Sequence, residues 1–367
     1  MSEQDGVEQI EGSLSAGDAG DRVVVLWEGA SAEVPTAGGP TLIGAADFEA
    51  VTGWDLRPEG LCSGEACVPV RDRSALEPFD GSIDLATAAT LLDRPVVVDV
   101  DAGVVAVGAA RGDRRRALVD REAPGFTLPD LDGVPRSLDD LSGRTTVLVT
   151  FSSWCGCRYD LPGWQQLADE LADDGLSVVA VAFDQDPEDV RPFTEEVTLP
   201  VLLDSAHLLS ELYAISNVPT VVWIDADGRV ARPNTPAFGT DTFVDFHGVP
   251  AGPHLDAIRA WVRTGDAGAP DGPAPEEMDL TDDEVTARLL FRIGAYLART
   301  GRDEEAAERL ARATELAPLD FTVARAAMPL TGRDPFGEEF FSLYEAWVAA
   351  GSPYHGRLPD AGRYRNG

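Results

Sequence analysis

Residues 121–265 predict an α/β domain in which helices cover both faces of a central sheet. Two apolar, β-branched runs, at residues 145–152 and 176–183, have the composition of buried strands. Between them, apolar residues recur three or four positions apart over residues 158–174, which predicts an amphipathic helix. Buried strands that alternate with helices of this length form a sheet with both faces covered.

The same domain contains three further predicted elements. A short apolar run at residues 201–204 and a longer one at 220–225 predict two more strands. The second strand is followed by a turn sequence that ends at Gly228, and residues 254–262 predict a closing helix.

A smaller α+β unit is predicted before this domain, over residues 22–118. Residues 22–27 predict a strand, whereas 45–52 and 82–93 predict short helices. Two valine-rich runs around an Asp-Ala-Gly turn, within residues 95–108, predict a β-hairpin. The unit resembles no fold that we recognise.

The remaining segments are predicted from composition. Residues 1–21 are acidic and rich in Gly and Ser, without the basic start and apolar run of a secretory signal, so we expect a disordered leader. Residues 266–283 are rich in Pro, Gly and acidic residues and predict a linker. Residues 284–350 predict helices only, and residues 351–367 a frayed polar tail.

Part of the helical segment, residues 287–318, resembles a single tetratricopeptide repeat. Small and apolar residues fall at the positions where two helices of such a repeat pack closely, and Gly301 falls in the turn; the others are Gly294, Leu297, Ala306, Leu310, Ala313 and Pro318. Because one repeat cannot bury its apolar face alone, we expect residues 335–350 to form a capping helix and the segment to pack onto the redox domain. The alternative is a weak interaction platform.

The formal net charge is −35, and all 29 basic residues are arginine. The acidic residues are distributed along the whole chain, and such a surface repels nucleic acids and anionic membranes. Dispersed acidity without lysine is typical of proteins from salt-loving microbes, because molar salt shortens the Debye length to about 3 Å and screens self-repulsion. The alternative is an acidic bias in a GC-rich genome. We expect a cytoplasmic protein.

The four cysteines form two close pairs, Cys62 with Cys67 and Cys155 with Cys157. In a cytoplasmic chain this pattern favours redox or metal chemistry over structural bridges. Cys155 and Cys157 follow a buried strand and open a helix, where free N–H groups and the helix dipole favour a thiolate. We expect Cys155 to be the more exposed, attacking thiol and Cys157 to be the resolving thiol.

Several segments, in chain order, resemble the thioredoxin-like thiol–disulfide oxidoreductases of the TlpA/ResA type, which neighbour the AhpC/TSA peroxiredoxins. The matching segments are Ala123–Gly133 (APGFTLPDLDG), Ser137–Gly143 (SLDDLSG), Cys157–Pro162 (CRYDLP) and Leu212–Val230 (LYAISNVPTVVWIDADGRV). The resemblance implies a thioredoxin fold for residues 121–265. It also implies that the chain is a thiol–disulfide oxidoreductase with an antioxidant role.

The resemblance also implies roles for residues around the cysteine pair. Pro219 matches a proline that is cis and lies beside the cysteines, and Val218 would offer its backbone to an extended substrate chain. The substrate-binding residues predicted are Trp154, Gly156, Val218 and Thr220, and we expect Trp154 to pack beside the site and shield it rather than to react. Asp160 replaces the family's glutamate and would tune a thiol or transfer protons, unless it is a solvated acid favoured by the helix dipole.

The cysteine spacing departs from the family, because only Gly156 separates the two residues whereas the family has two intervening residues. Residues i and i+2 of a helix do not face each other, so a Cys155–Cys157 bridge requires backbone strain, which glycine relieves. A strained disulfide is more easily reduced. We therefore expect an oxidising or isomerase-like couple.

Two other functions stay open. A peroxiredoxin-like thiol peroxidase is one, since Ser152 fits the hydroxyl position of the peroxidatic motif and Arg158 is a candidate arginine, but Leu148 stands at the motif's proline position. A non-catalytic thioredoxin-like scaffold that binds partners through its helical tail is the other.

The second pair, Cys62 and Cys67, has three interpretations. It could close a small disulfide loop that exchanges with Cys155 as a relay, join Cys155 and Cys157 around zinc, or be an unrelated bridge or two idle thiols. The sequence implies no nucleotide, flavin or metal cofactor. The expected partners are protein thiols or disulfides and an unidentified electron donor resembling thioredoxin or a small thiol, with no nucleic acid and no membrane.

Overall fold

The computed structural model describes residues 7–10, 22–268 and 279–353. The chain divides into two compact units: Met1–Gly112 with Thr281–Ala317, and Asp113–Leu280 with Pro318–Gly367. Most of the predicted leader, linker and tail lies outside the described residues. Within the predicted leader, Val7–Ile10 form strand β1, which pairs in parallel with a strand of the first unit.

The first unit is built on a five-stranded sheet in the order β1-β9-β10-β2-β3. Its other strands are β2 (Arg22–Trp27), β3 (Ala30–Pro35), β9 (Val96–Asp99) and β10 (Val104–Val107). Strands β9 and β10 are antiparallel, which confirms the predicted hairpin, and β10 runs parallel to β2. Valine side chains of these strands form the core of the unit, together with Phe48 and Leu85 of two helices.

Those helices are α1 (Ala45–Thr52), as predicted, and α3 (Leu85–Leu91). Helix α3 begins later than predicted because β8 (Ser82–Asp84) pairs with β4 (Leu42–Gly44). The Asp84 carboxylate then caps the helix by accepting from the backbone N–H of Thr87 at 2.8 Å. A small three-stranded sheet, β5 (Asp55–Arg57), β6 (Gly60–Ser63) and β7 (Ala66–Val68), and helix α2 (Arg73–Leu76) complete the N-terminal part.

Helices α10 (Asp282–Arg299) and α11 (Asp303–Leu316) also belong to the first unit and confirm the predicted helix pair. The two helices approach closely at Gly294, where an added Cβ would lie 2.7 Å from Leu310. Helix α10 packs on β9 and β10, and Arg309 of α11 forms a buried ion pair with Asp99, with Nε–Oδ2 at 2.7 Å. The helix pair thus shares core contacts with the first unit, and its packing onto the redox domain stays a prediction.

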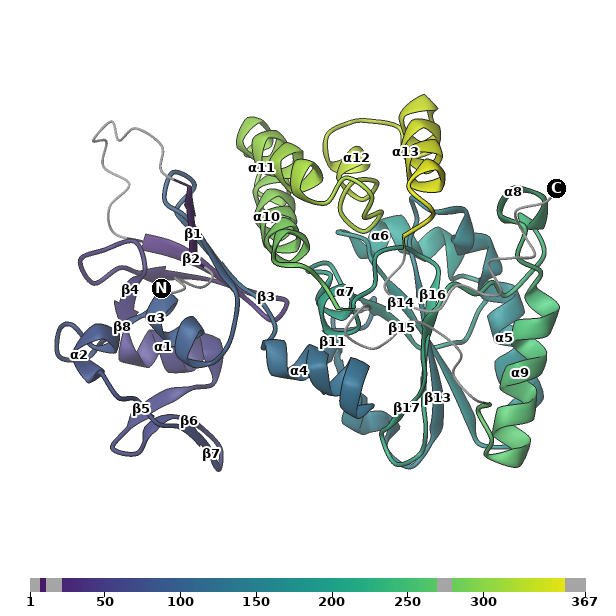
Figure 1. Ribbon diagram of the computed structural model, residues 1–367, viewed down its shortest axis with the longest axis horizontal. Coiled ribbons are helices and arrows are strands. Elements are labelled where there is room, and N and C mark those ends of the chain that lie inside the picture. Colours follow the sequence, from purple (N-terminus) through teal and green to yellow (C-terminus); the bar gives the residue numbers. More distant parts are fainter. Residues whose placement is uncertain (1–6, 11–21, 269–278, 354–367) are drawn as a thin grey trace. The chain divides into compact units, whose positions relative to one another are not determined.

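The second unit contains a five-stranded sheet in the order β15-β14-β13-β16-β17 (Figure 1). The strands are β13 (Thr145–Phe151), β14 (Leu176–Ala182), β15 (Val201–Leu203), β16 (Thr220–Ile224) and β17 (Val230–Thr235). Strands β13, β14 and β15 are parallel, whereas β16 and β17 are antiparallel additions beside β13. This arrangement confirms the predicted strands.

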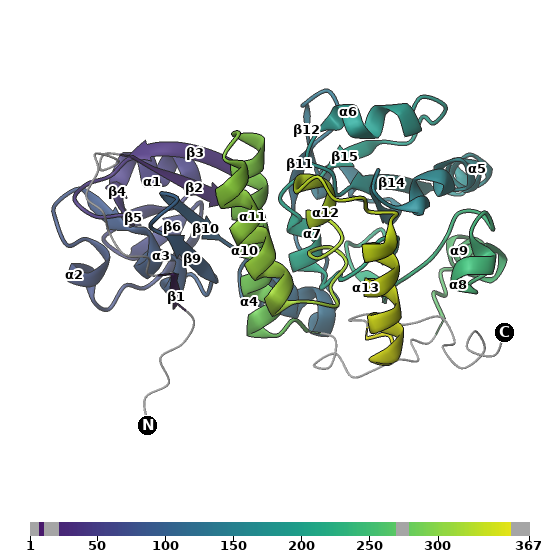
Figure 2. The same ribbon diagram turned by 90° about the horizontal axis from the view of Figure 1, so that it is seen from above.

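Helices cover both faces of this sheet, as the sequence predicted. Helices α5 (Leu161–Leu171) and α9 (Ala251–Thr264) lie on one face, where Trp164 and Trp261 pack with Val147, Val149 and Trp223. Helix α7 (Leu208–Leu212), which is buried along its length, lies on the other side of the sheet in both views (Figures 1 and 2).

Short elements connect the main ones. They are α4 (Arg111–Arg115), a π-helical turn (Arg116–Asp120), the β11–β12 hairpin (Thr127–Pro129 and Pro135–Ser137), a 3-10 turn (Leu138–Leu141), α6 (Pro187–Val190), a second 3-10 turn (Arg191–Phe193) and α8 (Val244–His247). Among the described residues, no helix combines the length and apolarity needed to cross a membrane.

The C-terminal segment belongs to the second unit, with α12 (Ala327–Leu330) and α13 (Glu338–Ala349). Phe321, Met328 and Phe340 form a small core, against which Tyr344 and Trp347 pack. The apolar side chains of α13 are therefore used within the unit that contains Cys155, and capping of the helix pair by residues 335–350 stays a prediction.

Candidate active site

Cys155 and Cys157 lie where β13 ends and a helix begins, as the sequence predicted. Cys155 is the N-cap of a 3-10 turn, Gly156–Asp160, that runs directly into α5. The two cysteines form a disulfide. The backbone N–H of Cys157 points at Cys155 Sγ, with 3.3 Å between nitrogen and sulfur. A donor in this position stabilises a thiolate on Cys155 when the disulfide is reduced.

Pro219 lies beside the cysteine pair, and the Val218–Pro219 peptide bond is cis, as the family resemblance implied. Cys155 Sγ lies 3.5 Å from the carbonyl oxygen of Val218. The loop before β16 therefore brings its backbone directly against the sulfur.

The two cysteines are almost equally buried, with 5% of Cys155 and 4% of Cys157 exposed. The expectation that Cys155 would be clearly more exposed is therefore wrong. Both residues line a cavity whose far wall comes from the C-terminal segment, and this wall shields Cys155 from bulk solvent.

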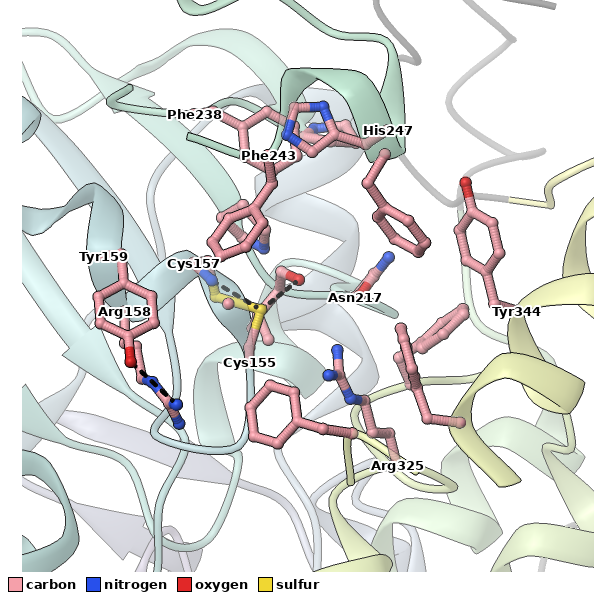
Figure 3. Close-up of a pocket in the computed structure, with 18 of the residues that line it drawn as sticks. Cys155, Cys157, Arg158, Tyr159, Asn217, Phe238, Phe243, His247, Arg325 and Tyr344 are labelled. Atoms are coloured by element: carbon pink, nitrogen blue, oxygen red, sulfur yellow. Dashed lines mark hydrogen bonds between the residues drawn. A yellow bond between two sulfur atoms is a disulfide. The ribbon is translucent and has the colours of Figure 1, made fainter. Parts of the chain in front are cut away.

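The cavity has a volume of about 430 Å³ and is lined mainly by aromatic rings (Figure 3). A volume of this size is typical of small-molecule sites. The rings come from three segments: Tyr159 after the cysteines, three phenylalanines before α9, and five rings of the C-terminal segment. The full aromatic set is Tyr159, Phe238, Phe243, Phe246, Phe321, Phe336, Phe340, Phe341 and Tyr344.

Gly156 lies at the cavity wall, and its lack of a side chain has a structural reason. An added Cβ would lie only 3.0 Å from the ring of Phe243, so a larger residue would displace that ring. Gly156 and Val218 are thus the two predicted substrate-binding residues that line the cavity, together with Pro219 and both cysteines.

Trp154 and Thr220, also predicted to bind substrate, are buried behind the cavity and do not line it. The indole N–H of Trp154 donates to the carbonyl of Phe183 at 3.2 Å. The backbone N–H of Thr220 donates to Thr150 Oγ1 at 3.0 Å, and its hydroxyl donates to Asn217 O at 2.6 Å. These contacts fix the backbone on either side of the site.

Asp160 is buried, with 2% exposed, so the alternative of a solvated first-turn acid is wrong. One carboxylate oxygen accepts from the backbone N–H of Thr240 at 2.9 Å and from its hydroxyl at 2.6 Å. The other oxygen is buried and has no hydrogen-bond partner among the described residues. Burial raises the pKa of Asp160 to about 6, despite the opposing hydrogen bonds from Thr240.

A second buried carboxylate, Asp184, was not predicted. It follows β14 and accepts from Ser152 Oγ at 2.8 Å and from the backbone N–H of Ser153 at 3.0 Å, and the Ser153 hydroxyl also donates to it. Burial raises the pKa of Asp184 to about 6. Asp184 therefore holds the loop that precedes Cys155. The sequence signal that could have identified Asp184 is its position just after the buried strand β14, which neighbours β13.

The hydroxyl of Ser152 bears on the peroxidase alternative. Ser152 is fully buried and its hydroxyl donates to Asp184, so it is not available to a peroxide bound at Cys155. The loop therefore lacks the free hydroxyl that the peroxidatic motif requires, in addition to the proline that Leu148 replaces.

Two arginines flank the site. Arg158 donates to the carbonyl of Ser153, and its guanidinium lies over the ring of Phe193 at 4.5 Å. Arg325, which the sequence did not indicate, is buried in the C-terminal wall and lies over the ring of Phe340 at 3.7 Å.

Cys62 and Cys67 also form a disulfide, which confirms the predicted local loop bridge. They face each other on β6 and β7, with Cα atoms 4.1 Å apart; Cys62 is fully buried, whereas Cys67 is exposed. The zinc alternative requires four free thiolates, but each of the four sulfurs forms a disulfide with the other cysteine of its pair. Exchange with Cys155 stays a prediction.

Comparison with known proteins places this site in a broader context. Residues 119–232 match the model of the AhpC/TSA family. The chain is 34% identical over 116 residues to the thioredoxin-like protein YneN of Bacillus subtilis, covering 30% of this chain and 67% of that protein. It is 28% identical over 148 residues to the thiol–disulfide oxidoreductase ResA of Bacillus anthracis, covering 39% of this chain and 86% of that protein.

Two solved structures are also similar to part of this chain. The crystal structure of StoA from Bacillus subtilis is 26% identical, with 31% of this chain and 90% of that chain covered and a TM-score of 0.27. The thioredoxin domain of a thiol–disulfide oxidoreductase from Bacteroides vulgatus is 22% identical, with 38% and 95% covered and a TM-score of 0.32.

The family match has a boundary that matters for the site. It includes both cysteines and the Val218–Pro219 bond, but it ends before the phenylalanines that precede α9 and before the whole C-terminal wall. More than half of the residues that line the cavity therefore lie outside the matched region.

Proposed function

Because this chain belongs to the thioredoxin-like family of ResA-type thiol–disulfide oxidoreductases, we propose that Cys155 and Cys157 are its redox-active pair. One observation carries the proposal. The disulfide lies at the start of a helix, against the backbone of Val218, and forms part of the wall of a cavity.

The exchange proceeds in two steps. A partner thiolate attacks Cys155 Sγ, the Cys155–Cys157 bond breaks, and Cys157 leaves as a thiolate that takes up a proton. A second partner thiolate then attacks the partner sulfur of the mixed disulfide and releases Cys155 as a thiolate. The backbone N–H of Cys157 favours the release of Cys155 in this second step, since a donor stabilises negative charge on Cys155 Sγ. Two thiols are oxidised and one disulfide is reduced; the reverse sequence oxidises the enzyme.

Asp160 is the candidate for proton transfer. It lies on the same 3-10 turn as Cys157, and its pKa of about 6 is close to neutral pH, where a group exchanges protons efficiently. A pH profile of the exchange rate that loses its acidic limb in Asp160→Asn would support this role.

The partners form part of the proposal. We propose protein thiols or disulfides as substrates, held in an extended form along Val218, and a thioredoxin-like or small-thiol electron donor. We also keep a cytoplasmic location and salt adaptation as proposals. The distributed charge of −35 supports the salt adaptation, and fractionation of the source cells would test the location.

Reduction of insulin disulfides by the protein, with dithiothreitol as the reductant, tests the proposed function. We expect Cys155→Ser to reduce the rate to the uncatalysed background. Cys157→Ser should retain attack by Cys155 but accumulate the mixed disulfide, which mass spectrometry detects. Undiminished reduction by Cys155→Ser would contradict the proposal and favour the scaffold alternative.

A further inference from the structure

The C-terminal wall of the cavity contributes a cation as well as aromatic rings. Arg325 precedes α12 and is only 6% exposed. Its guanidinium points into the cavity that contains Cys155 (Figure 3). Neither the exchange mechanism nor the matched family region accounts for this residue.

Arg325 is held in place by contacts that do not neutralise it. Its Nε donates to the carbonyl of Pro335 at 3.0 Å, and the guanidinium lies over the rings of Phe340 at 3.7 Å and Phe336 at 5.2 Å. Within residues 22–268 and 279–353, it forms no ion pair with a carboxylate, and its two terminal nitrogens donate no hydrogen bond. These donors are therefore available to a ligand.

A buried cation without a counterion is unfavourable, and a second cation increases the cost. Arg158 lies over the same Phe336 ring at 4.8 Å. Burial, with a smaller contribution from Arg158, lowers the pKa of Arg325 to about 9, so the residue is still charged at neutral pH. The chain has 64 acidic residues, yet none of those described pairs with Arg325. An anion from outside the chain would supply the missing charge.

The rest of the cavity restricts what this anion can be. A guanidinium with two free terminal nitrogens matches a carboxylate, which it can hold through two parallel hydrogen bonds. The aromatic lining favours an apolar or planar body, and the volume of about 430 Å³ suits a small molecule. Cys155 in the same cavity favours a ligand that carries sulfur.

We propose that the cavity binds a low-molecular-weight thiol or disulfide that carries a carboxylate, with the carboxylate on Arg325 and the sulfur against Cys155 Sγ. The inference rests on the proposed function, since it names the small-molecule partner of the same cysteine pair. Arg325 is a specificity-determining residue in this scheme, because it binds the ligand and leaves the sulfur chemistry unchanged.

The reaction balances without another reagent. A disulfide ligand accepts attack by the Cys155 thiolate, one ligand thiolate leaves, and a mixed disulfide forms. Cys157, after losing its proton, then attacks Cys155 Sγ, which closes the protein disulfide and releases the second ligand thiolate. The protein dithiol loses two electrons, and the ligand disulfide gains them.

Two aromatic disulfides of similar size separate charge recognition from sulfur reactivity. Dithiobis(nitrobenzoate) carries two carboxylates, whereas dithiodipyridine is neutral at the pH of the experiment. The reduced full-length protein is mixed with each compound at one fixed salt concentration, and the coloured thiol released is followed by stopped flow. Mass spectrometry assigns the reacting cysteine.

We expect Arg325→Gln to lower the rate with dithiobis(nitrobenzoate) about tenfold, the loss of one good charge-assisted contact, and to keep the rate with dithiodipyridine within about twofold. Arg325→Lys should give an intermediate rate. The matched control is Arg333→Gln, which removes the same charge from the same segment. Arg333 is 37% exposed, pairs with Glu339 and does not line the cavity, so neither rate should change by more than about twofold.

Competition in the unmodified protein provides a test that needs no variant. Nitrobenzoate, which has no reactive sulfur, should slow the alkylation of reduced Cys155, whereas the neutral nitrobenzamide at the same concentration should not. Equal effects of the two compounds would overturn the inference even if Arg325→Gln failed to fold.

Other outcomes also contradict the inference. Equal slowing of both disulfides by Arg325→Gln, or a loss in Arg333→Gln as large as that in Arg325→Gln, would show that Arg325 does not bind a carboxylate. If Arg325→Gln slowed the reduction of insulin but the reaction with neither small disulfide, Arg325 would be assigned to a protein partner instead. If the reduced protein reacted with neither disulfide at Cys155, the proposed function itself would fail, which is a distinct result.

Discussion

The molecule contains two disulfides between near neighbours in sequence, and their surroundings differ completely. Cys62 and Cys67 face each other on adjacent strands of a small sheet, one sulfur fully buried and the other residue exposed. Cys155 and Cys157 lie at the end of a central strand, with a backbone N–H, the carbonyl of Val218 and an aromatic cavity around them.

This difference is the basis for the proposal that Cys155 and Cys157, and not the other pair, form the redox site. Sequence proximity brings the sulfurs together in both places. Only at Cys155 do the surroundings provide a donor that stabilises the leaving thiolate and a cavity through which a partner can approach. The pair in the first unit instead joins two strands of a small sheet that contributes part of a core through Leu61.

The largest expected effect comes from removing cysteines of each pair in turn by mutation. Cys155→Ser should lower the insulin reduction rate to the background given by dithiothreitol alone, because the nucleophile is lost. The double variant Cys62→Ser, Cys67→Ser should keep the rate within about twofold. A fall of more than about tenfold in the double variant would instead support the relay between the pairs.

The next effect tests how the loop before Cys155 is held. Asp184→Ala removes the acceptor for both hydroxyls and for the N–H of Ser153, so we expect the free energy of unfolding to fall by about 2–4 kcal/mol. Asp186→Ala, at an exposed helix cap two residues later, should cost only about 1 kcal/mol. Urea unfolding measures both values, and equal losses would show that burial at Asp184 is not important.

The pH dependence of stability follows from the two buried carboxylates. Burial raises the pKa of Asp160 from its usual value of 3.8 to about 6, so between these pH values the folded state binds more protons than the unfolded state. The stabilising contribution is therefore complete below pH 3.8 and is lost as the pH rises through about 6. The expected loss is on the order of 3 kcal/mol, and Asp184 should add a similar slope.

Asp160→Asn isolates one of these two contributions. Between pH 4 and pH 7, the free energy of unfolding should change by up to ~3 kcal/mol less in the variant than in the original protein. At pH 7.5 the variant should be the more stable of the two. Urea titrations at several pH values give the comparison. Parallel pH curves for the two proteins would refute a raised pKa at Asp160.

Salt is expected to have the smallest effect on the difference in reactivity between the two disulfides. Molar KCl screens the charge of −35 and should raise the melting temperature by several degrees through the whole fold. The order in which the two disulfides are reduced should not change. A melting temperature that stays the same between low and molar KCl would contradict the proposed salt adaptation.

The central strand, the cysteine placement and the cis Val218–Pro219 bond were predictable because each depends on a short stretch of chain. A buried strand can be recognised from a run such as residues 145–152, and the helix that follows from its apolar spacing. The resemblance then supplied the position of Pro219. Prediction worked where local pattern and family motif coincide.

The cavity was not predictable, because its far wall comes from residues about 170 positions away from Cys155. Arg325 and Phe340 look like ordinary residues of helical sequence, and nothing local marks them as part of the site. Asp184 was closer to prediction, since polar residues just past buried strands commonly serve a site at that edge of the sheet.

The same reasoning explains why the contacts between the helix pair and the first unit were not predicted. Helices α10 and α11 follow the redox domain in sequence, so packing onto it was the simplest expectation. Their buried arginine, Arg309, pairs with Asp99, 210 residues earlier in the chain. The two halves of this buried ion pair carry no signal that links them in sequence.

A redox titration with mass-spectrometric labelling of all four cysteines tests the central claim most directly. Our account predicts that Cys155 and Cys157 titrate together as one two-electron couple, at a more oxidising potential than Cys62 and Cys67. If Cys155 resists both reduction and alkylation while Cys62 and Cys67 titrate, the redox site has been assigned to the wrong pair and the account is contradicted.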